Sequence, residues 1–176
     1  MKKSVLLLFF AGCVATGIFG IGRKIPMNRV NDLGQREGYW RDSLGEGITH
    51  ELYYKGGKKD GLFKCFIRNE LFLFGEYTAD NMSGTWYMFG DEGELRCTID
   101  SIELNKDSIY TGYCRIFCKY KCYCADYYPS GAVKSEGYMV CDEDFMVDFW
   151  EIGEWKYYDE SGNLIKTKDY GDRRTP

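Results

Sequence analysis

The stretch Gly84-Thr85-Trp86-Tyr87-Met88-Phe89-Gly90-Asp91-Glu92-Gly93-Glu94-Leu95 recurs later in the chain as Gly153-Glu154-Trp155-Lys156-Tyr157-Tyr158-Asp159-Glu160-Ser161-Gly162-Asn163-Leu164. The two copies share a glycine, an aromatic residue two positions later, a second glycine after an acidic turn, and a leucine. They lie 69 positions apart, which is three periods of 23 residues. Shared columns at a fixed period indicate an internal repeat.

The same period continues toward the N-terminus. Three successive glycines are 23 residues apart, and each is followed two positions later by a large aromatic residue: Trp40, Phe63 or Trp86. Between positions 95 and 136 the phase is lost, which we interpret as degenerate copies. The predicted repeat glycines are Gly38, Gly61, Gly84 and Gly153.

Within each copy the apolar pattern has a period of two residues, which is typical of a half-buried β-strand. Trp86 and Met88 alternate with neighbours on the other face, and Asp91-Glu92-Gly93 supplies a turn in which glycine adopts a positive φ. Each unit is therefore predicted to be two short strands and a turn. Because one hairpin cannot cover its own apolar face, we expect an all-β antiparallel meander over residues 36–170, with almost no helix beyond the N-terminal segment.

Glycine-aromatic units of 23 residues with a preceding tyrosine resemble MORN repeats, and this form is similar to the bacterial MORN-variant proteins often labelled YwqK-family antitoxins. The matching stretches are Tyr54–Phe66, Tyr77–Leu95 and Trp150–Leu164, with a partial copy at Glu37–Gly47. The resemblance implies an antiparallel β-meander used for protein or membrane contact. The antitoxin label implies neutralisation of a specific partner.

Residues 1–22 are predicted to be a signal peptide or membrane anchor. Lys2-Lys3 precede an uncharged run from Ser4 to Gly22, which is the order of a secretory signal. Phe10-Ala11-Gly12-Cys13 resembles a bacterial lipobox, and this resemblance implies lipid attachment at Cys13. The run is also about as long as a membrane-spanning helix, so an uncleaved anchor and an ordinary cleaved signal are alternatives.

All three alternatives place the rest of the chain outside the cytoplasm or at the membrane, and we expect a domain anchored to a membrane of the bacterial cell envelope. Residues 23–35 would then be a linker and residues 171–176 a polar tail. The net charge of −4 argues against a nucleic-acid partner. With 44% hydrophobic and 17% aromatic residues, the chain can bury a core.

Motifs for catalysis are missing from the sequence. His50 is the single histidine, and no nucleophile elbow, P-loop or zinc-protease motif occurs. The acidic-aromatic run 142–151 offers paired carboxylates, which a glycosidase would need, but it also fits a half-exposed strand and turn. We therefore predict a protein that is not an enzyme and has no cofactor.

The chain has eight cysteines, including Cys13 and Cys65. Four others lie at even-numbered positions of a predicted strand and would therefore share one face: Cys114, Cys118, Cys122 and Cys124. They are interpreted either as packing residues or as partners for cross-strand disulfides to Cys97 or Cys141. A metal site is not predicted, because the spacing lacks a paired C-x2-C motif and no histidine assists. The candidate disulfide residues are Cys97, Cys114, Cys118, Cys122, Cys124 and Cys141.

A single-layer sheet cannot bury both faces, so exposed aromatic side chains are candidate contacts. These candidates are Tyr39, Trp40, Tyr53, Tyr87 and Trp155. The sequence thus predicts an envelope-tethered, non-catalytic β-repeat module that binds or scaffolds an unknown protein partner or a membrane surface. The alternatives are a toxin-neutralising protein and an envelope glycosidase or carbohydrate binder.

Overall fold

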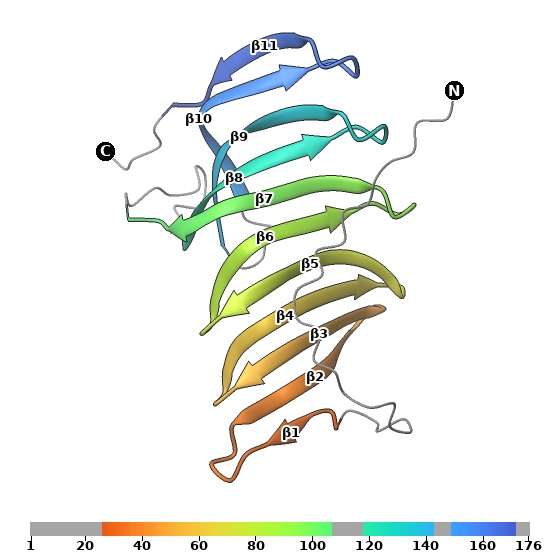
Figure 1. Ribbon diagram of the computed structural model, residues 1–176, viewed down its shortest axis with the longest axis vertical. Coiled ribbons are helices and arrows are strands. Elements are labelled where there is room, and N and C mark those ends of the chain that lie inside the picture. The colour runs from red at the N-terminus through yellow and green to blue at the C-terminus, as the bar shows by residue number, and fades with distance from the viewer. Residues whose placement is uncertain (1–25, 107–117, 143–148, 172–176) are drawn as a thin grey trace, which may run out of the picture.

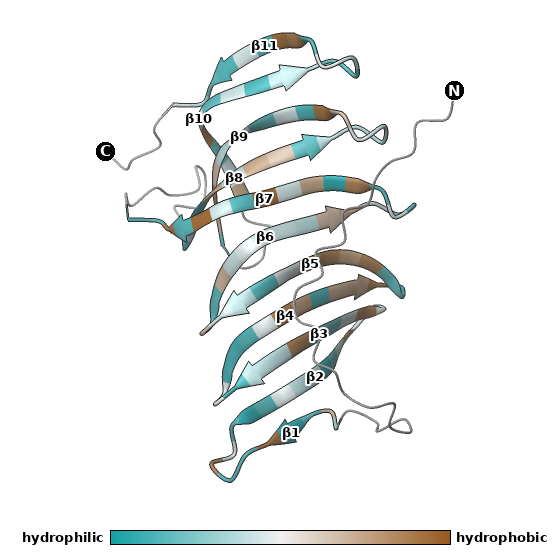
Figure 2. Ribbon diagram, in the orientation of Figure 1, coloured by the Kyte–Doolittle hydropathy of each residue, from teal (hydrophilic) through white to brown (hydrophobic). Residues whose placement is uncertain are grey.

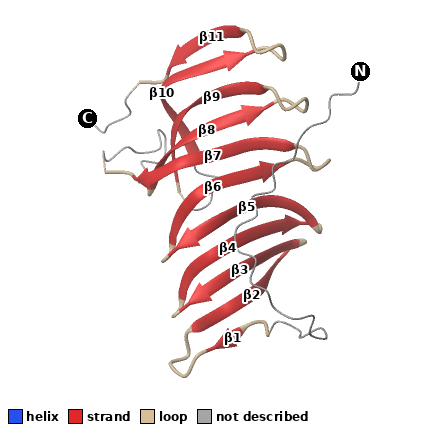
Figure 3. Ribbon diagram, in the orientation of Figure 1, coloured by secondary structure: helices blue, strands red, loops and turns tan. Residues whose placement is uncertain are grey.

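A computed structural model describes residues 26–106, 118–142 and 149–171, and these form one antiparallel sheet of eleven strands (Figure 1). Each strand pairs with the next one along the chain, so the sheet is a meander from β1 to β11. All the elements in these residues are strands (Figure 3). The predicted all-β antiparallel meander is confirmed, whereas the segment 1–22, Cys13 and Cys114 lie outside the described residues.

The strands are mostly six to ten residues long. The predicted linker 23–35 contains the short strand β1. This strand pairs with Arg36 and Glu37 of β2 and so forms the first edge strand of the sheet. The bounds are β1 Arg29–Val30, β2 Arg36–Gly45, β3 Ile48–Lys55, β4 Lys58–Ile67, β5 Glu70–Thr78, β6 Asn81–Phe89, β7 Leu95–Leu104, β8 Tyr120–Tyr127, β9 Val133–Cys141, β10 Phe149–Tyr158 and β11 Leu164–Asp169.

Tight turns connect the first strands. Glu46-Gly47 and Gly56-Gly57 join β2 to β3 and β3 to β4, and all four residues have positive φ. Two-residue hairpins of this kind match the twist of the flanking strands. Arg68-Asn69 and Ala79-Asp80 make the next two turns with φ values of 49° to 70°, although neither contains glycine. These two turns lacked the usual glycine signal.

One face of the sheet, here called the inner face, carries the hydrophobic core. In Figure 2 apolar and polar segments alternate along the strands, as this one-sided burial requires. The aromatics of the 23-residue period lie on this face in β2, β4, β6 and β10. The buried core residues are Leu52, Phe63, Cys65, Leu73, Tyr77, Met82, Trp86, Cys97, Ile99, Tyr120, Cys122, Cys124, Met139, Cys141 and Trp155.

Three of the four glycines of the period lie where the strand register shifts. Gly61, Gly84 and Gly153 each fall inside an irregularity of the ladder, between β3 and β4, β5 and β6, and β9 and β10 respectively. Their φ values are 133°, 65° and 60°. Gly38 in β2 has a φ of 73°. An extra residue with positive φ is the signature of a β-bulge, which bends and twists the strand.

Gly84→Val is expected to lower the free energy of unfolding by about 1–2 kcal/mol, because a branched side chain strains a backbone at φ +65°. A Cβ at this position would meet no other described atom within 4 Å, so the cost is conformational rather than steric. Gly84→Asn is the matched control, since asparagine tolerates positive φ and should cost less. Equal urea midpoints for wild type and Gly84→Val would contradict the bulge role.

Candidate interaction face and thiol cluster

The opposite side of the sheet, here called the outer face, carries pairs of aromatic rings on neighbouring strands. Tyr39 on β2 is directly opposite Tyr53 on β3, and their ring centroids are 5.6 Å apart. Two further pairs lie on the same face. They are Phe74–Tyr87 between β5 and β6, at 6.1 Å, and Tyr123–Tyr138 between β8 and β9, at 5.2 Å.

A row of directly opposed residues crosses this outer face from β2 to β11. The register places them side by side in neighbouring strands, so their side chains share one face. The row combines charged, aromatic and small side chains. Its members are Arg41, Glu51, Lys64, Phe74, Tyr87, Thr98, Ala125, Glu136, Lys156 and Thr167.

Burial and neighbouring carboxylates raise the pKa of tyrosine hydroxyls on the outer face. Burial raises the pKa of Tyr39 to about 12, and its hydrogen bond to Glu51 adds to the shift. Burial and the neighbouring Glu136 likewise raise the pKa of Tyr123 to about 12. The Tyr158 hydroxyl donates to Oε1 of Glu136 at 2.6 Å. Tyr39 and Tyr123 therefore stay protonated donors even near pH 10, where an unshifted tyrosine is about half ionised.

The predicted contact aromatics divide between the two faces. Tyr39, Tyr53 and Tyr87 lie on the outer face, where Tyr53 is 40% exposed and the other two are half-buried. Trp155 is not exposed: it is 4% exposed on the inner face, and its Nε1 donates to the carbonyl of Tyr138 at 2.7 Å. The expectation that Trp155 is an exposed contact is therefore wrong, because its strand turns that side chain into the core.

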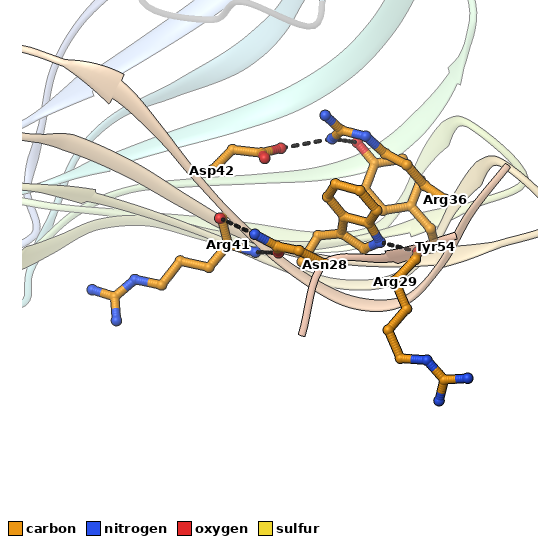
Figure 4. Close-up of polar contacts among 7 residues, drawn as sticks. Asn28, Arg29, Arg36, Arg41, Asp42 and Tyr54 are labelled. Carbon is orange, nitrogen blue, oxygen red and sulfur yellow. Dashed lines mark hydrogen bonds and ion pairs between the residues drawn. The ribbon is translucent and has the colours of Figure 1, made fainter. Parts of the chain in front are cut away.

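Arg36 lies beside Asp42 and Tyr54 at the N-terminal end of the inner face (Figure 4), and its guanidinium covers the Trp40 ring. The Arg36 guanidinium carbon is 4.2 Å from the Trp40 ring centroid and 5.1 Å from that of Tyr54. It also donates to Asp42 at 2.6 Å and to the Tyr54 hydroxyl at 3.0 Å. Trp40 Nε1 donates to the carbonyl of Arg29 at 3.1 Å. Trp40 is thus half-buried against Arg36 and Tyr54. Sequence reasoning missed Arg36.

The predicted cysteine strand is realised in part. Cys122 and Cys124 lie side by side on the inner face of β8, and each meets a cysteine of a flanking strand. The Sγ atoms of Cys97 and Cys124 are 3.2 Å apart, and those of Cys122 and Cys141 are 3.5 Å apart. Both contacts join the strands named by the sequence analysis, β7 to β8 and β8 to β9.

Cys118 does not share the face of Cys122 and Cys124. It precedes β8 and packs with Val140 and Ile152 in a second buried cluster. Val140 alternates with the inner-face residue Met139 along β9, so this second cluster lies on the outer face. The expected even-numbered face is wrong at Cys118, because regular pairing in β8 begins only at Tyr120.

Cys122 and Cys141 are expected to form a disulfide in exported protein, because both are 0% exposed and already in contact. Closing a loop across their separation of 19 residues should stabilise the fold by about 2 kcal/mol. This stabilisation is lower than the chain-entropy value for a loop of that length, because Cys122 and Cys141 are diagonal neighbours in the ladder rather than directly opposite each other. Thiol counting and mass spectrometry on unreduced protein test it, and free thiols at both positions would contradict it.

A cavity of about 330 Å³ opens on the inner face beside the thiols. Its walls are mostly apolar and come from β6 to β10. No motif or spacing in the sequence predicts this cavity. Asp126, Lys134 and Glu151 contribute its charged groups. The apolar and sulfur-containing walls are Met88, Cys97, Ile99, Cys124, Met139, Phe149, Trp155 and Tyr157.

His50 packs edge-on against Phe63, with ring centroids 5.0 Å apart.

Comparisons with protein-family models, with curated proteins and with solved structures give no match for this chain. Within residues 26–106, 118–142 and 149–171, no helix is long and apolar enough to cross a bilayer.

Proposed function

We propose that the chain is an envelope-tethered, non-catalytic binding module of the MORN type, which contacts a protein or a membrane surface through its outer face. The aromatic pairs of that face carry this proposal. Tyr39–Tyr53, Phe74–Tyr87 and Tyr123–Tyr138 recur along the sheet, so one extended ligand surface can meet several of them. Tyrosine is enriched at protein interfaces because it pairs an apolar ring with a hydrogen-bonding hydroxyl.

The charges of the outer face favour a polar protein surface as the partner. Arg41, Glu51 and Lys64 alternate in sign across β2, β3 and β4. Alternating charge gives register and specificity to a contact between proteins, whereas an anionic bilayer would select a uniformly basic face. The toxin-neutralising alternative differs only in the nature of the partner, and it rests on the resemblance to the antitoxin-labelled proteins.

The proposal is tested by capturing partners from native membranes with the full chain and identifying them by mass spectrometry. The variant Tyr39→Ser/Tyr53→Ser should lose the specific partner while keeping the fold. Leu44→Ser is the matched control, because Leu44 is an exposed apolar residue on the same strand as Tyr39. A partner retained by the tyrosine variant, or lost equally by both variants, would contradict a role for the outer face.

Cys13→Ser is expected to leave an unprocessed precursor without lipid, because Phe10-Ala11-Gly12-Cys13 resembles a lipobox. Metabolic labelling with a fatty acid checks this outcome in the wild type and the variant. A wild-type chain that takes up no label would overturn the lipoprotein proposal and leave the uncleaved anchor or the cleaved signal.

A further inference from the structure

Two thiols and one carboxylate from neighbouring strands converge on the inner face. Cys97 on β7 is directly opposite Asp126 on β8, and Cys124 lies two residues earlier on the same face of β8. The two Sγ atoms are 3.2 Å apart, and all three potential ligand atoms lie within 4.8 Å of one another. Elsewhere in the described residues, no group of three or more His, Cys, Asp or Glu side chains meets this criterion.

We infer that Cys97, Cys124 and Asp126 form a binding site for a zinc-class divalent cation. Thiolates and a carboxylate are common zinc ligands, and two sulfur ligands exclude the hard cations magnesium and calcium. On binding, each thiol releases its proton to solvent, and the two thiolates and the carboxylate donate electron pairs to the ion. No redox change is involved.

The geometry needs only a small adjustment to accept the ion. Two sulfurs at the usual zinc–sulfur bond length are roughly 3.8 Å apart in a tetrahedral site. The observed contact between Cys97 and Cys124 is 3.2 Å, so these side chains must separate by about half an ångström. Both residues lie on regularly paired segments of β7 and β8, which keeps the backbone in place.

A residue outside the ligand set orients the Asp126 carboxylate. Ser135 on β9 is directly opposite Asp126, and its hydroxyl donates to Oδ2 at 2.9 Å. Ser135 is itself buried, so this hydrogen bond holds the carboxylate toward the inner face. Outer partners of this kind are typical of protein metal sites, where they fix the direction of a ligand.

The neighbourhood supplies an entry path and a reason for uptake. All three ligands line the cavity of about 330 Å³, which leaves room for water or a further ligand at the fourth coordination position. The positive charge of a bound cation would offset the cost of burying two thiolates. Among the described residues, the Cys122–Cys141 pair has no carboxylate in the position that Asp126 takes beside Cys97 and Cys124.

The experiment uses the full chain, purified under reducing, oxygen-free conditions and titrated with Zn²⁺ against a chromophoric chelator. We expect one Zn²⁺ per chain. Co²⁺ in its place should give the thiolate-to-cobalt absorption of a sulfur-ligated tetrahedral site. Cys97→Ser and Asp126→Asn should each weaken binding at least tenfold, and Ser135→Ala should weaken it about tenfold through the carboxylate.

Cys65→Ser is the matched control, because Cys65 is another buried cysteine of the inner face, on β4. It should leave the Zn²⁺ affinity unchanged. Circular dichroism confirms that each variant is folded, and Asp126→Asn tests the site without changing a core thiol. Absence of stoichiometric binding, equal loss in the control, or a Cys97–Cys124 disulfide in protein isolated without reductant would overturn the proposal.

Discussion

Trp86→Ala is expected to lower the free energy of unfolding by about 4 kcal/mol, the largest effect of any single truncation proposed for this chain. The Trp86 side chain is 1% exposed and lies in an aromatic cluster of the inner face. Its ring centroid is 5.1 Å from that of Tyr77, nearly perpendicular, and 5.4 Å from that of Phe63. The truncation removes buried area, leaves a cavity and breaks both ring contacts.

Tyr87→Ala is the control for Trp86→Ala. Tyr87 is the next residue in β6, but it is half-buried on the outer face, where truncation leaves an open surface rather than a cavity. We expect a loss of about 1 kcal/mol or less. Urea unfolding followed by fluorescence and circular dichroism measures both variants. Similar losses in the two would show that the inner face is not the core of the sheet.

The face on which each aromatic residue lies could not be predicted from alternation. Tyr39-Trp40 and Trp86-Tyr87 both place two large aromatics at adjacent positions, so either residue could point inward. The pairing of the strands decides which aromatic residue faces the core. Trp86 is directly opposite Ile99, and Trp155 is directly opposite Gly137, so both tryptophans lie on the inner face. The 23-residue period predicted a shared face but not which face is covered.

Strand connections were predictable only where glycine marked them. The acidic residues and the glycine of Asp91-Glu92-Gly93 predict a turn, and this segment joins β6 to β7. The turns Arg68-Asn69 and Ala79-Asp80 carry no glycine, and their conformation depends on the strands that they connect. A further irregularity lies between Asp100 and Glu103 in β7, where Ser101 has a φ of 51°. Serine does not usually adopt a positive φ, so the sequence does not predict a bulge at this position.

The thiol cluster shows the same limit. Parity along β8 placed Cys122 and Cys124 on one face, and the next strands were correctly named as the source of their neighbours. The register selects the actual partners, and it also brings Asp126 opposite Cys97. A spacing rule within one strand could not find a ligand set divided between two strands.

Gly137→Ala is expected to lower the free energy of unfolding by about 3 kcal/mol through a collision in the core. Gly137 on β9 lies under the indole of Trp155, and an added Cβ would be 2.5 Å from its Cγ and Cδ1 atoms. The indole cannot move aside easily, because it is buried and its Nε1 donates to the carbonyl of Tyr138. Gly75 meets Trp86 in the same way, so both indoles require a glycine on the neighbouring strand.

A double-mutant cycle separates this collision from a general intolerance of substitution at Gly137. Trp155→Leu removes the ring that the new methyl group would strike, so Gly137→Ala should cost at least 1 kcal/mol less in that background than in the wild type. Gly137 does not have a positive φ, which means that alanine strains no backbone there and the steric contact alone accounts for the loss. Additive losses in the two variants would show that the glycine serves something other than the close approach of the indole.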